Sequence, residues 1–215
     1  MKVDSVKSPS FQALPVSEIK IKGIDSKYKL FECSPKDSEF LGDLVTKVKL
    51  AKLMPDMSAW DIFAWNNTFK HSVIFNYDEA KILLEACDGV PCGILNYRFT
   101  DGPLHLMYAV TMPDRVNHRV PAAGQILFNE VFSRFLKSDV PNIELTAMRR
   151  TPFNPEEKYR KFGFFPVCDD AYSVYMRAWR EEIAKTFEKQ KEFIQVKYIE
   201  NPEEVDLGKV LSIQA

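Results

Sequence analysis

The chain has 215 residues, with 29 lysines and arginines against 30 acidic residues, so its net charge is close to zero. A near-neutral chain does not attract a phosphate backbone as a whole, which argues against nonspecific binding to nucleic acid. It contains no run of eighteen apolar residues and does not begin with a charged and then apolar segment, so we expect neither a membrane span nor a signal peptide. These features predict a soluble, cytoplasmic protein.

The four cysteines and three histidines give little support to a metal site. Cys87 and Cys92 flank the turn 88–91 and could face each other across a hairpin. There is no second close pair to complete a zinc tetrahedron, and the histidines are widely spaced. Reduced, partly buried thiols are the simplest interpretation, and we expect no metal.

The first part of the chain predicts a lead-in, one strand and two helices. Residues 1–26 carry Pro9, Pro15 and scattered serines, which is typical of an extended or partly disordered segment. Residues 28–33 alternate as a strand. Apolar residues between 40 and 53 recur at helical spacing behind N-cap candidates, and Pro55 ends this helix. Residues 57–75 hold five aromatic side chains and predict a second helix followed by a loop.

From residue 81 onwards the apolar period changes to two. Residues 81–87, 91–99 and 104–112 predict three strands, because Asp-Gly pairs stand where two hairpin turns are needed. A helix is expected over 121–136 and a strand over 142–148. Asn154 and Pro155 then open a short helix that Gly163 ends. A last strand over 172–178 precedes a charged helix over 179–196 and a tail.

This order of elements predicts a mixed α/β sheet with a candidate ligand site. The helix after the meander should return its following strand parallel to the last meander strand by a right-handed crossover. Such neighbouring strands leave their carboxyl ends beside a helix N-terminus, where open α/β sheets bind ligands. The small residues Ala122, Ala123 and Gly124 at this helix start let backbone N–H groups approach a phosphate closely.

Two motifs resemble one known family. They are Arg119-x-x-Ala122-x-Gly124 after the meander and Tyr159-x-Lys161-x-Gly163-Phe164 further on. Together they are similar to the GCN5-related N-acetyltransferases (GNAT), over roughly residues 27–178 and most specifically over 104–166. The resemblance implies an α/β fold with a central, mostly antiparallel sheet flanked by helices. It also implies a GNAT-like domain over 27–178, with an N-terminal extension (1–26) and a C-terminal helix and tail (179–215).

The resemblance implies transfer of the acetyl group of acetyl-CoA to a primary amine, by direct attack in a ternary complex. The amine would belong to a small molecule or a peptide, with neither nucleic acid nor a membrane as partner. Val110 and Met112 would pair with the pantetheine arm, Asn154 would contact CoA, and Tyr159 would protonate the leaving thiolate. The CoA pyrophosphate would bind beside Arg119, on the backbone N–H groups of Val120, Ala122, Ala123, Gly124 and Gln125.

The base and the acceptor site are less constrained. Glu144, on the strand after the phosphate-binding helix, is the carboxylate that we choose as general base, although alternation could equally turn it to solvent. The aromatic segment is the candidate acceptor site, with Asp61 or Asp56 attracting a cationic amine. Its apolar wall would be formed by Trp60, Trp65, Phe69 and Tyr77, for which packing in the core is the alternative interpretation.

Two departures from the family pattern leave a second hypothesis open. Ala122 replaces the usual first glycine, which is tolerable only if that residue keeps a negative φ. Pro121 has no N–H and removes one possible phosphate donor. The alternative is therefore a non-catalytic CoA-binding module or a protein-interaction module. The latter would use the N-terminal extension and the C-terminal helix to pair with a partner or with a second copy as a homodimer. The apolar surface of that helix would come from Trp179, Phe187 and Phe193.

Overall fold

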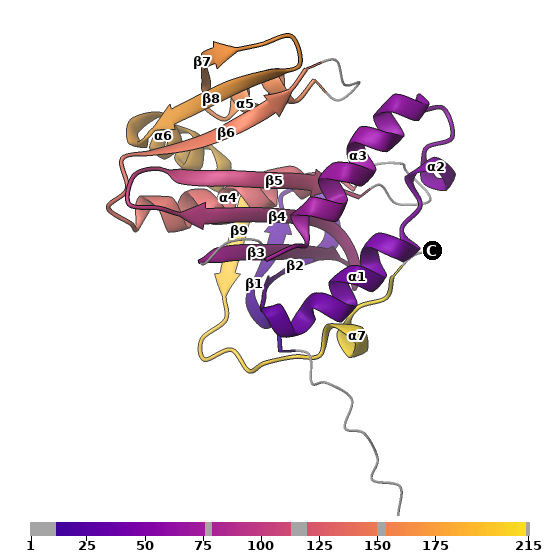
Figure 1. Cartoon of the computed structure of the whole chain (residues 1–215). Helices are drawn as coiled ribbons and strands as arrows, with labels where there is room; N and C mark the ends of the chain where they lie inside the picture. Colours follow the sequence, from indigo (N-terminus) through magenta and orange to yellow (C-terminus); the bar gives the residue numbers. More distant parts are fainter. Residues whose placement is uncertain (1–11, 76–78, 113–119, 150–153, 214–215) are drawn as a thin grey trace, which may run out of the picture.

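A computed structural model describes residues 12–75, 79–112, 120–149 and 154–213 of the chain. These residues form a single sheet of nine strands with helices on both faces (Figure 1). The strands are β1 (Leu14–Ile21), β2 (Ile24–Cys33), β3 (Ala80–Cys87), β4 (Val90–Phe99), β5 (Leu104–Thr111), β6 (Asn142–Met148), β7 (Phe165–Asp169), β8 (Ser173–Trp179) and β9 (Ile194–Tyr198). The helices are α1 (Ser38–Lys47), α2 (Leu50–Leu53), α3 (Ala59–Ser72), α4 (Ala123–Leu136), α5 (Pro155–Lys161), α6 (Arg180–Lys191) and α7 (Leu207–Val210), with a 3-10 turn at Pro35–Asp37.

The strands lie in the order β7-β8-β6-β5-β4-β3-β2-β1-β9. Every neighbouring pair is antiparallel except β5 and β6, which are parallel and joined by the crossover through α4. The predicted α/β fold, with a mostly antiparallel sheet and a single parallel crossover, is therefore confirmed.

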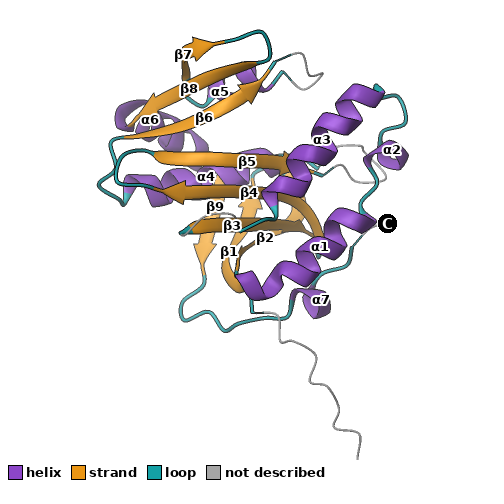
Figure 2. Cartoon of the chain, in the orientation of Figure 1, coloured by secondary structure: helices purple, strands orange, loops and turns teal. Residues whose placement is uncertain are grey.

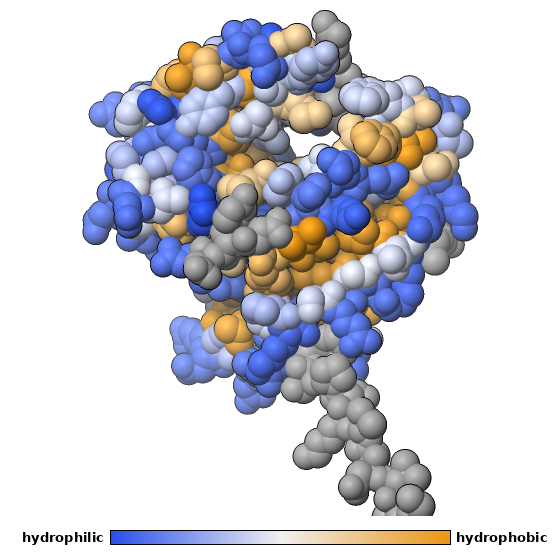
Figure 3. Space-filling view, in the orientation of Figure 1, coloured by the Kyte–Doolittle hydropathy of each residue, from blue (hydrophilic) through white to orange (hydrophobic). Residues whose placement is uncertain are grey.

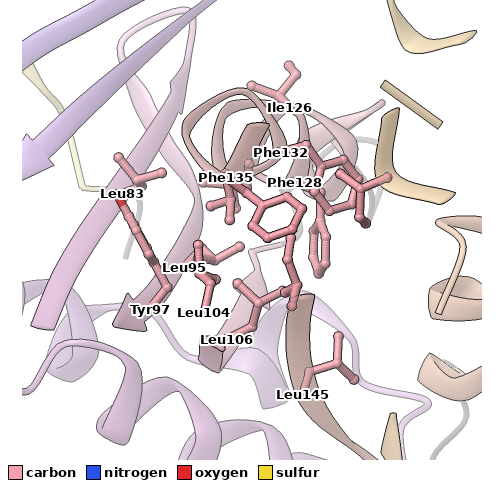
Figure 4. Close-up of a cluster of buried hydrophobic side chains, with 14 of the residues drawn as sticks. Leu83, Leu95, Tyr97, Leu104, Leu106, Ile126, Phe128, Phe132, Phe135 and Leu145 are labelled. Carbon is pink, nitrogen blue, oxygen red and sulfur yellow. The ribbon is translucent and has the colours of Figure 1, made fainter. Parts of the chain in front are cut away.

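Two apolar clusters cover the two faces of the sheet. Helices α4, α5 and α6 lie behind it in Figure 1, and α1 and α3 lie in front. The rear cluster is built around Phe128, Phe132 and Phe135 of α4, which point at leucines of β3, β4, β5 and β6 (Figure 4). Each of these phenylalanines is at most 3 % exposed, so their burial holds α4 against these four strands.

The front face is only partly covered. Helices α1 and α3 pack over β2 to β5, where Phe69 and Val110 belong to the front cluster. Among the described residues no helix lies in front of β6, β8 and β7 (Figure 2). Several exposed apolar side chains belong to this uncovered region, namely Met148, Phe165, Val167, Tyr172 and Trp179.

The two ends of the described chain belong to the sheet, which differs from the predicted extension and tail. Residues 14–21 form β1, whose Ser17, Ile19 and Ile21 are buried, and β1 pairs with both β2 and β9. Pro15 and Ser17 interrupt the apolar alternation, which is why no strand was expected there. The helix expected over 179–196 ends at Lys191, because the chain turns and enters β9.

Other differences are local. The helix expected over 40–53 is broken at Val48, whose ψ of 116° is extended, so α1 and α2 are separate. Strand β7 was missed because all five of its residues are exposed and show no alternation. In the β3–β4 register Cys87 is opposite Val90 and not Cys92, and all four cysteines are free.

The described residues contain no helix that is long and apolar enough to cross a membrane. Within the same ranges, no three His, Cys, Asp or Glu side chains gather in a way that could hold a metal ion.

Candidate active site

Strands β5 and β6 pair only at their starts and then diverge. Leu104–Leu106 pair with Ile143–Leu145, and no later pair forms between the described residues of the two strands. The register of β5 against β4 shifts at the same point, where Met107 is an extra residue between Leu106 and Tyr108. A bulge bends a strand and increases its twist, which explains the divergence. Figure 1 shows the two arrows separating, and Figure 3 shows the front face hollowed between β6 and α3.

The diverging strands leave backbone groups of β5 without a strand partner. The N–H of Met112 donates to the carbonyl of Cys92 at 2.8 Å, so Met112 faces β4. Because backbone groups alternate along a strand, Val110 also faces β4, whereas Ala109 and Thr111 face the open edge. The Nε1–H of Trp65 donates to the Thr111 carbonyl from the front at 3.2 Å. The geometry thus favours Ala109 and Thr111, not the predicted Val110 and Met112, for pairing with an extended ligand arm.

The N-terminus of α4 lies beside the end of this open edge. A Cβ on Gly124 would lie 3.5 Å from Cγ2 of Thr111. The first hydrogen bond of the helix runs from Ile126 N to Ala122 O at 3.0 Å, so the N–H groups of Ala123, Gly124 and Gln125 have no acceptor within the helix. These donors, together with the positive end of the helix dipole, make a site for an anion.

In the turn that enters α4, Ala122 does not keep the negative φ that was expected. Ala122 has φ 59°, in the left-handed region, at a cost of roughly 1 kcal/mol for a residue with a Cβ. The benefit is geometric, since a left-handed residue followed by right-handed ones turns successive N–H groups towards one concavity. The hydroxyl of Tyr28 donates to the Pro121 carbonyl at 2.9 Å and holds this turn on β2. Arg119 lies outside the described residues, and Val120 is half-buried.

Tyr159 lies on the rear side of the sheet. Its ring packs against Phe128 and Phe164, with centroid separations of 5.6 and 6.1 Å. Burial raises the pKa of Tyr159 to about 12, so its hydroxyl stays protonated at neutral pH and is able to donate a proton.

The side chain of Asn154 is occupied by its own helix. Its Oδ1 accepts from Glu157 N at 3.4 Å and its Nδ2 donates to Glu157 Oε2 at 3.0 Å. Asn154 therefore caps α5, as predicted, and in this geometry it has less capacity to contact a cofactor.

Glu144 faces the front, opposite to Tyr159. Its Oε1 accepts from Arg177 Nη2 at 2.7 Å, from Arg177 Nε at 2.8 Å and from Asn142 Nδ2 at 3.0 Å. Burial alone would raise the pKa of Glu144, but hydrogen bonds from Tyr175, Arg177 and Asn142 lower it below its ordinary value. A carboxylate that is so well paired is a weak proton acceptor, so this geometry does not favour Glu144 itself as the base.

The predicted acceptor residues are not all together. Trp65 packs on Phe69 and reaches β5 as described. Trp60 is 59 % exposed and contacts Phe63 on the surface of α3. Asp61 receives the hydroxyl of Ser58 at 2.5 Å in the cap of the same helix. Only Trp65 of the three predicted residues therefore lies at the open edge of β5, and Tyr77 lies outside the described residues.

Comparisons with known proteins give structural neighbours only. No protein-family model and no curated protein matches the chain. Among solved structures, a nucleotide-linked sugar GNAT, apo FdhC, matches with a TM-score of 0.55 and 14 % identity, over 86 % of this chain and 97 % of that one.

Two further neighbours are similar in extent. An uncharacterized protein (bh2621) from Bacillus halodurans gives a TM-score of 0.54 at 14 % identity, over 82 % of this chain and 96 % of its own. The PaiA N-acetyltransferase from Thermoplasma acidophilum, solved in complex with coenzyme A, gives 0.52 at 14 % identity, over 71 % and 98 %. The chain thus has the fold of the GCN5-related N-acetyltransferases, as its two motifs predicted.

Proposed function

We propose that this protein is an acetyl-CoA-dependent N-acetyltransferase that acts on a primary amine. The observation that carries the proposal is the open edge of β5 beside the N-terminus of α4. A pyrophosphate on the N–H groups of Ala123, Gly124 and Gln125 would start a ligand arm next to Thr111. The arm would then run along Ala109 towards the point where β5 and β6 meet.

The two faces of the sheet support a division of chemical roles. The thioester would lie near Met107, about 13 Å from Thr111 at 3.3 Å per residue. The amine would attack from the front, where no helix of the described residues covers β6. Tyr159, on the rear side, would give its proton to the leaving thiolate. The direct attack in a ternary complex needs no covalent intermediate on the protein.

A non-catalytic CoA-binding module or a protein-interaction module is the second candidate. Two observations favour it, namely the strained Ala122 and the hydrogen bond of Trp65 to Thr111, which occupies one acceptor on the open edge. A CoA-binding module would bind acetyl-CoA without turnover, a protein-interaction module would not bind it, and only the acetyltransferase would bind it and turn it over.

The experiment is calorimetry with acetyl-CoA, followed by a free-thiol release assay with spermidine, lysine and glucosamine as amines. We expect binding in the micromolar to millimolar range and thiol release with at least one amine. The absence of binding at millimolar acetyl-CoA would contradict the acetyltransferase proposal. Binding without thiol release over a wide amine panel would favour the second candidate.

A matched pair of variants tests the location of the phosphates. Gln125→Glu adds a negative charge to the exposed first turn of α4 without changing its size, which should leave the helix as stable or more stable. It should weaken acetyl-CoA binding by about tenfold, because one unpaired like charge near the phosphates costs of the order of 1.4 kcal/mol. Gln195→Glu, exposed on β9, adds the same charge elsewhere and should leave the affinity unchanged.

A further inference from the structure

A row of polar side chains crosses the front of the sheet where β5 and β6 stop pairing. Arg98 of β4 is opposite His105 of β5, His105 is opposite Glu144 of β6, and Glu144 is opposite Arg177 of β8. Residues paired in this way point to the same face. The last rung of the β5–β6 ladder, Leu106 with Leu145, follows directly. On β5 the row therefore lies two residues from Met107, near which a thioester on the open edge would end.

Within this row, Glu144 holds one oxygen towards an accessible imidazole. Its Oε1 takes the hydrogen bonds of Arg177 and Asn142, and its Oε2 faces Nδ1 of His105 at 3.8 Å. The side chain of Glu144 is 6 % exposed, whereas that of His105 is 32 % exposed. The carboxylate is thus fixed and shielded, and the imidazole is open to the front.

A carboxylate that faces one nitrogen of an imidazole favours the proton on that nitrogen. The other nitrogen then keeps its lone pair and is able to accept a proton. An imidazole also titrates near neutrality, where proton transfer from an amine is most efficient. The separation of 3.8 Å is too long for a hydrogen bond, but such contacts commonly shorten when substrate binds.

We propose that His105 is the general base of the acetyl transfer and that Glu144 is its positioning residue. The amine nitrogen attacks the thioester carbon, so that a C–N bond forms and the C–S bond breaks. Before this attack Nε2 of His105 takes the excess proton of the ammonium group, and after it the nitrogen loses a second proton to water. The thiolate takes the proton of Tyr159 from the other face. Solvent then removes the proton from His105 and restores that of Tyr159. This inference rests on the proposed function.

Charged groups lie around His105 on three strands. Glu144 favours the protonated imidazole, while Arg98 and Arg177 oppose it. His71 of α3 stacks on Tyr108, whose side chain shares the front face, with 5.6 Å between the ring centroids. The pH profile of a variant therefore has to be read against the wild-type protein.

The first test uses the nuclear magnetic resonance of ¹⁵N-labelled histidines, with the His105 signals assigned by their loss in His105→Gln. Long-range ¹H–¹⁵N correlations above pH 7.5 should show the proton of His105 on Nδ1. Glu144→Gln should shift the imidazole towards the Nε2–H form. A wild-type His105 that already carries its proton on Nε2, or that does not respond to Glu144→Gln, would overturn the proposal.

The second test compares two nucleophiles. With the best primary amine of the panel, His105→Gln should lower the rate at pH 7 by about 100-fold or more, with unchanged acetyl-CoA affinity by calorimetry. The rate should recover as the pH rises and the free amine becomes available. Hydroxylamine, which is unprotonated at neutral pH, needs no base and should be acetylated at nearly the wild-type rate.

The outcomes separate the inference from the function on which it rests. Equal rates of wild type and His105→Gln with the primary amine would remove His105 from the mechanism while the acetyltransferase stands. An equal loss with both nucleophiles would indicate a disturbed site and would also overturn the role of base. A wild-type protein that does not bind acetyl-CoA would overturn the proposed function, whatever the tautomer of His105.

Discussion

Glu85 on β3 is completely buried, and we predict that it makes the protein less stable as the pH rises from 5 to 8. Neither carboxyl oxygen has a hydrogen-bond partner of normal geometry among the described residues. Gly93 provides the space, because a Cβ there would lie 3.0 Å from Oε2 of Glu85. Burial raises the pKa of Glu85 well above its ordinary value, and the thiol of Cys92 offsets this only in part. The folded protein therefore keeps this carboxyl protonated and neutral.

The magnitude follows from the count of protons in the two states. Above pH 5 the unfolded chain has lost the Glu85 proton, while the folded protein still holds it. Each further pH unit then lowers the free energy of unfolding by about 1.4 kcal/mol. The stabilising contribution is fully present below the unfolded pKa of about 4.3 and is lost as the pH rises through the raised pKa of the folded state.

Glu85→Gln is the perturbation, because it keeps the size and the neutral character of the side chain and removes its titration. Urea unfolding, followed by far-ultraviolet circular dichroism at pH 5, 6, 7 and 8, gives the free energy of unfolding of both proteins. The difference between them should shift by about 1.4 kcal/mol per pH unit in favour of the glutamine. Other groups, such as Asp37, whose pKa is also raised by burial, cancel in this difference. Glu203→Gln, on the exposed surface, is the matched control.

A difference that stays constant from pH 5 to pH 7 would refute the reasoning, since it would mean that Glu85 is ionised in the folded protein. A glutamine variant that is less stable by the same amount at every pH would show a packing effect alone.

Three further predictions concern single substitutions. Ala122→Gly should leave the free energy of unfolding nearly unchanged, because relief of the left-handed φ offsets the entropy of glycine. Ala123→Gly, the comparison, should cost about 1 kcal/mol or more, and equal losses in the two variants would contradict the strain at Ala122. Gly93→Ala should destabilise by about 1–3 kcal/mol in urea unfolding, because the new Cβ would lie 2.8 Å from Cδ1 of Leu127, and an unchanged midpoint would disprove the close approach. Trp65→Phe removes a hydrogen bond to β5, so it should lower the free energy of unfolding by about 1 kcal/mol. It should also abolish most of the tryptophan fluorescence change on addition of acetyl-CoA, and an undiminished change would place the ligand elsewhere.

The sequence predicted the central part of the fold because local signals there agree. The meander, α4 and α5 have clear periods, turn residues and caps, and Asn154 and Gly163 stand where the structure uses them. The strands near the two ends of the sheet carry weaker signals, since β1 buries Ser17 and β7 buries nothing. β1 also pairs with β9, far along the chain, and local alternation does not specify this pairing.

The same limit applies to the site. Alternation assigned Glu144 to a strand, but only the register across three strands brings it between His105 and Arg177. Likewise, the bulge at Met107 decides which residues of β5 turn their backbone to the open edge, and no single residue type predicts this bulge. The type of fold was therefore predictable from the sequence, whereas the residues that line the open edge were not.

The pairing of β1 with β9 has a consequence for synthesis of the chain. Ile19 is opposite Val196, so this edge of the sheet closes only when residues up to Tyr198 have left the ribosome. Until then a nascent chain displays β1 as an unpaired edge, with a row of free N–H and C=O groups. Contacts this distant in sequence also form late, because the long loop between them must close first. Strand β1 thus waits for β9, which is synthesised long after it, and β1 is the segment that a chaperone would have most reason to shield.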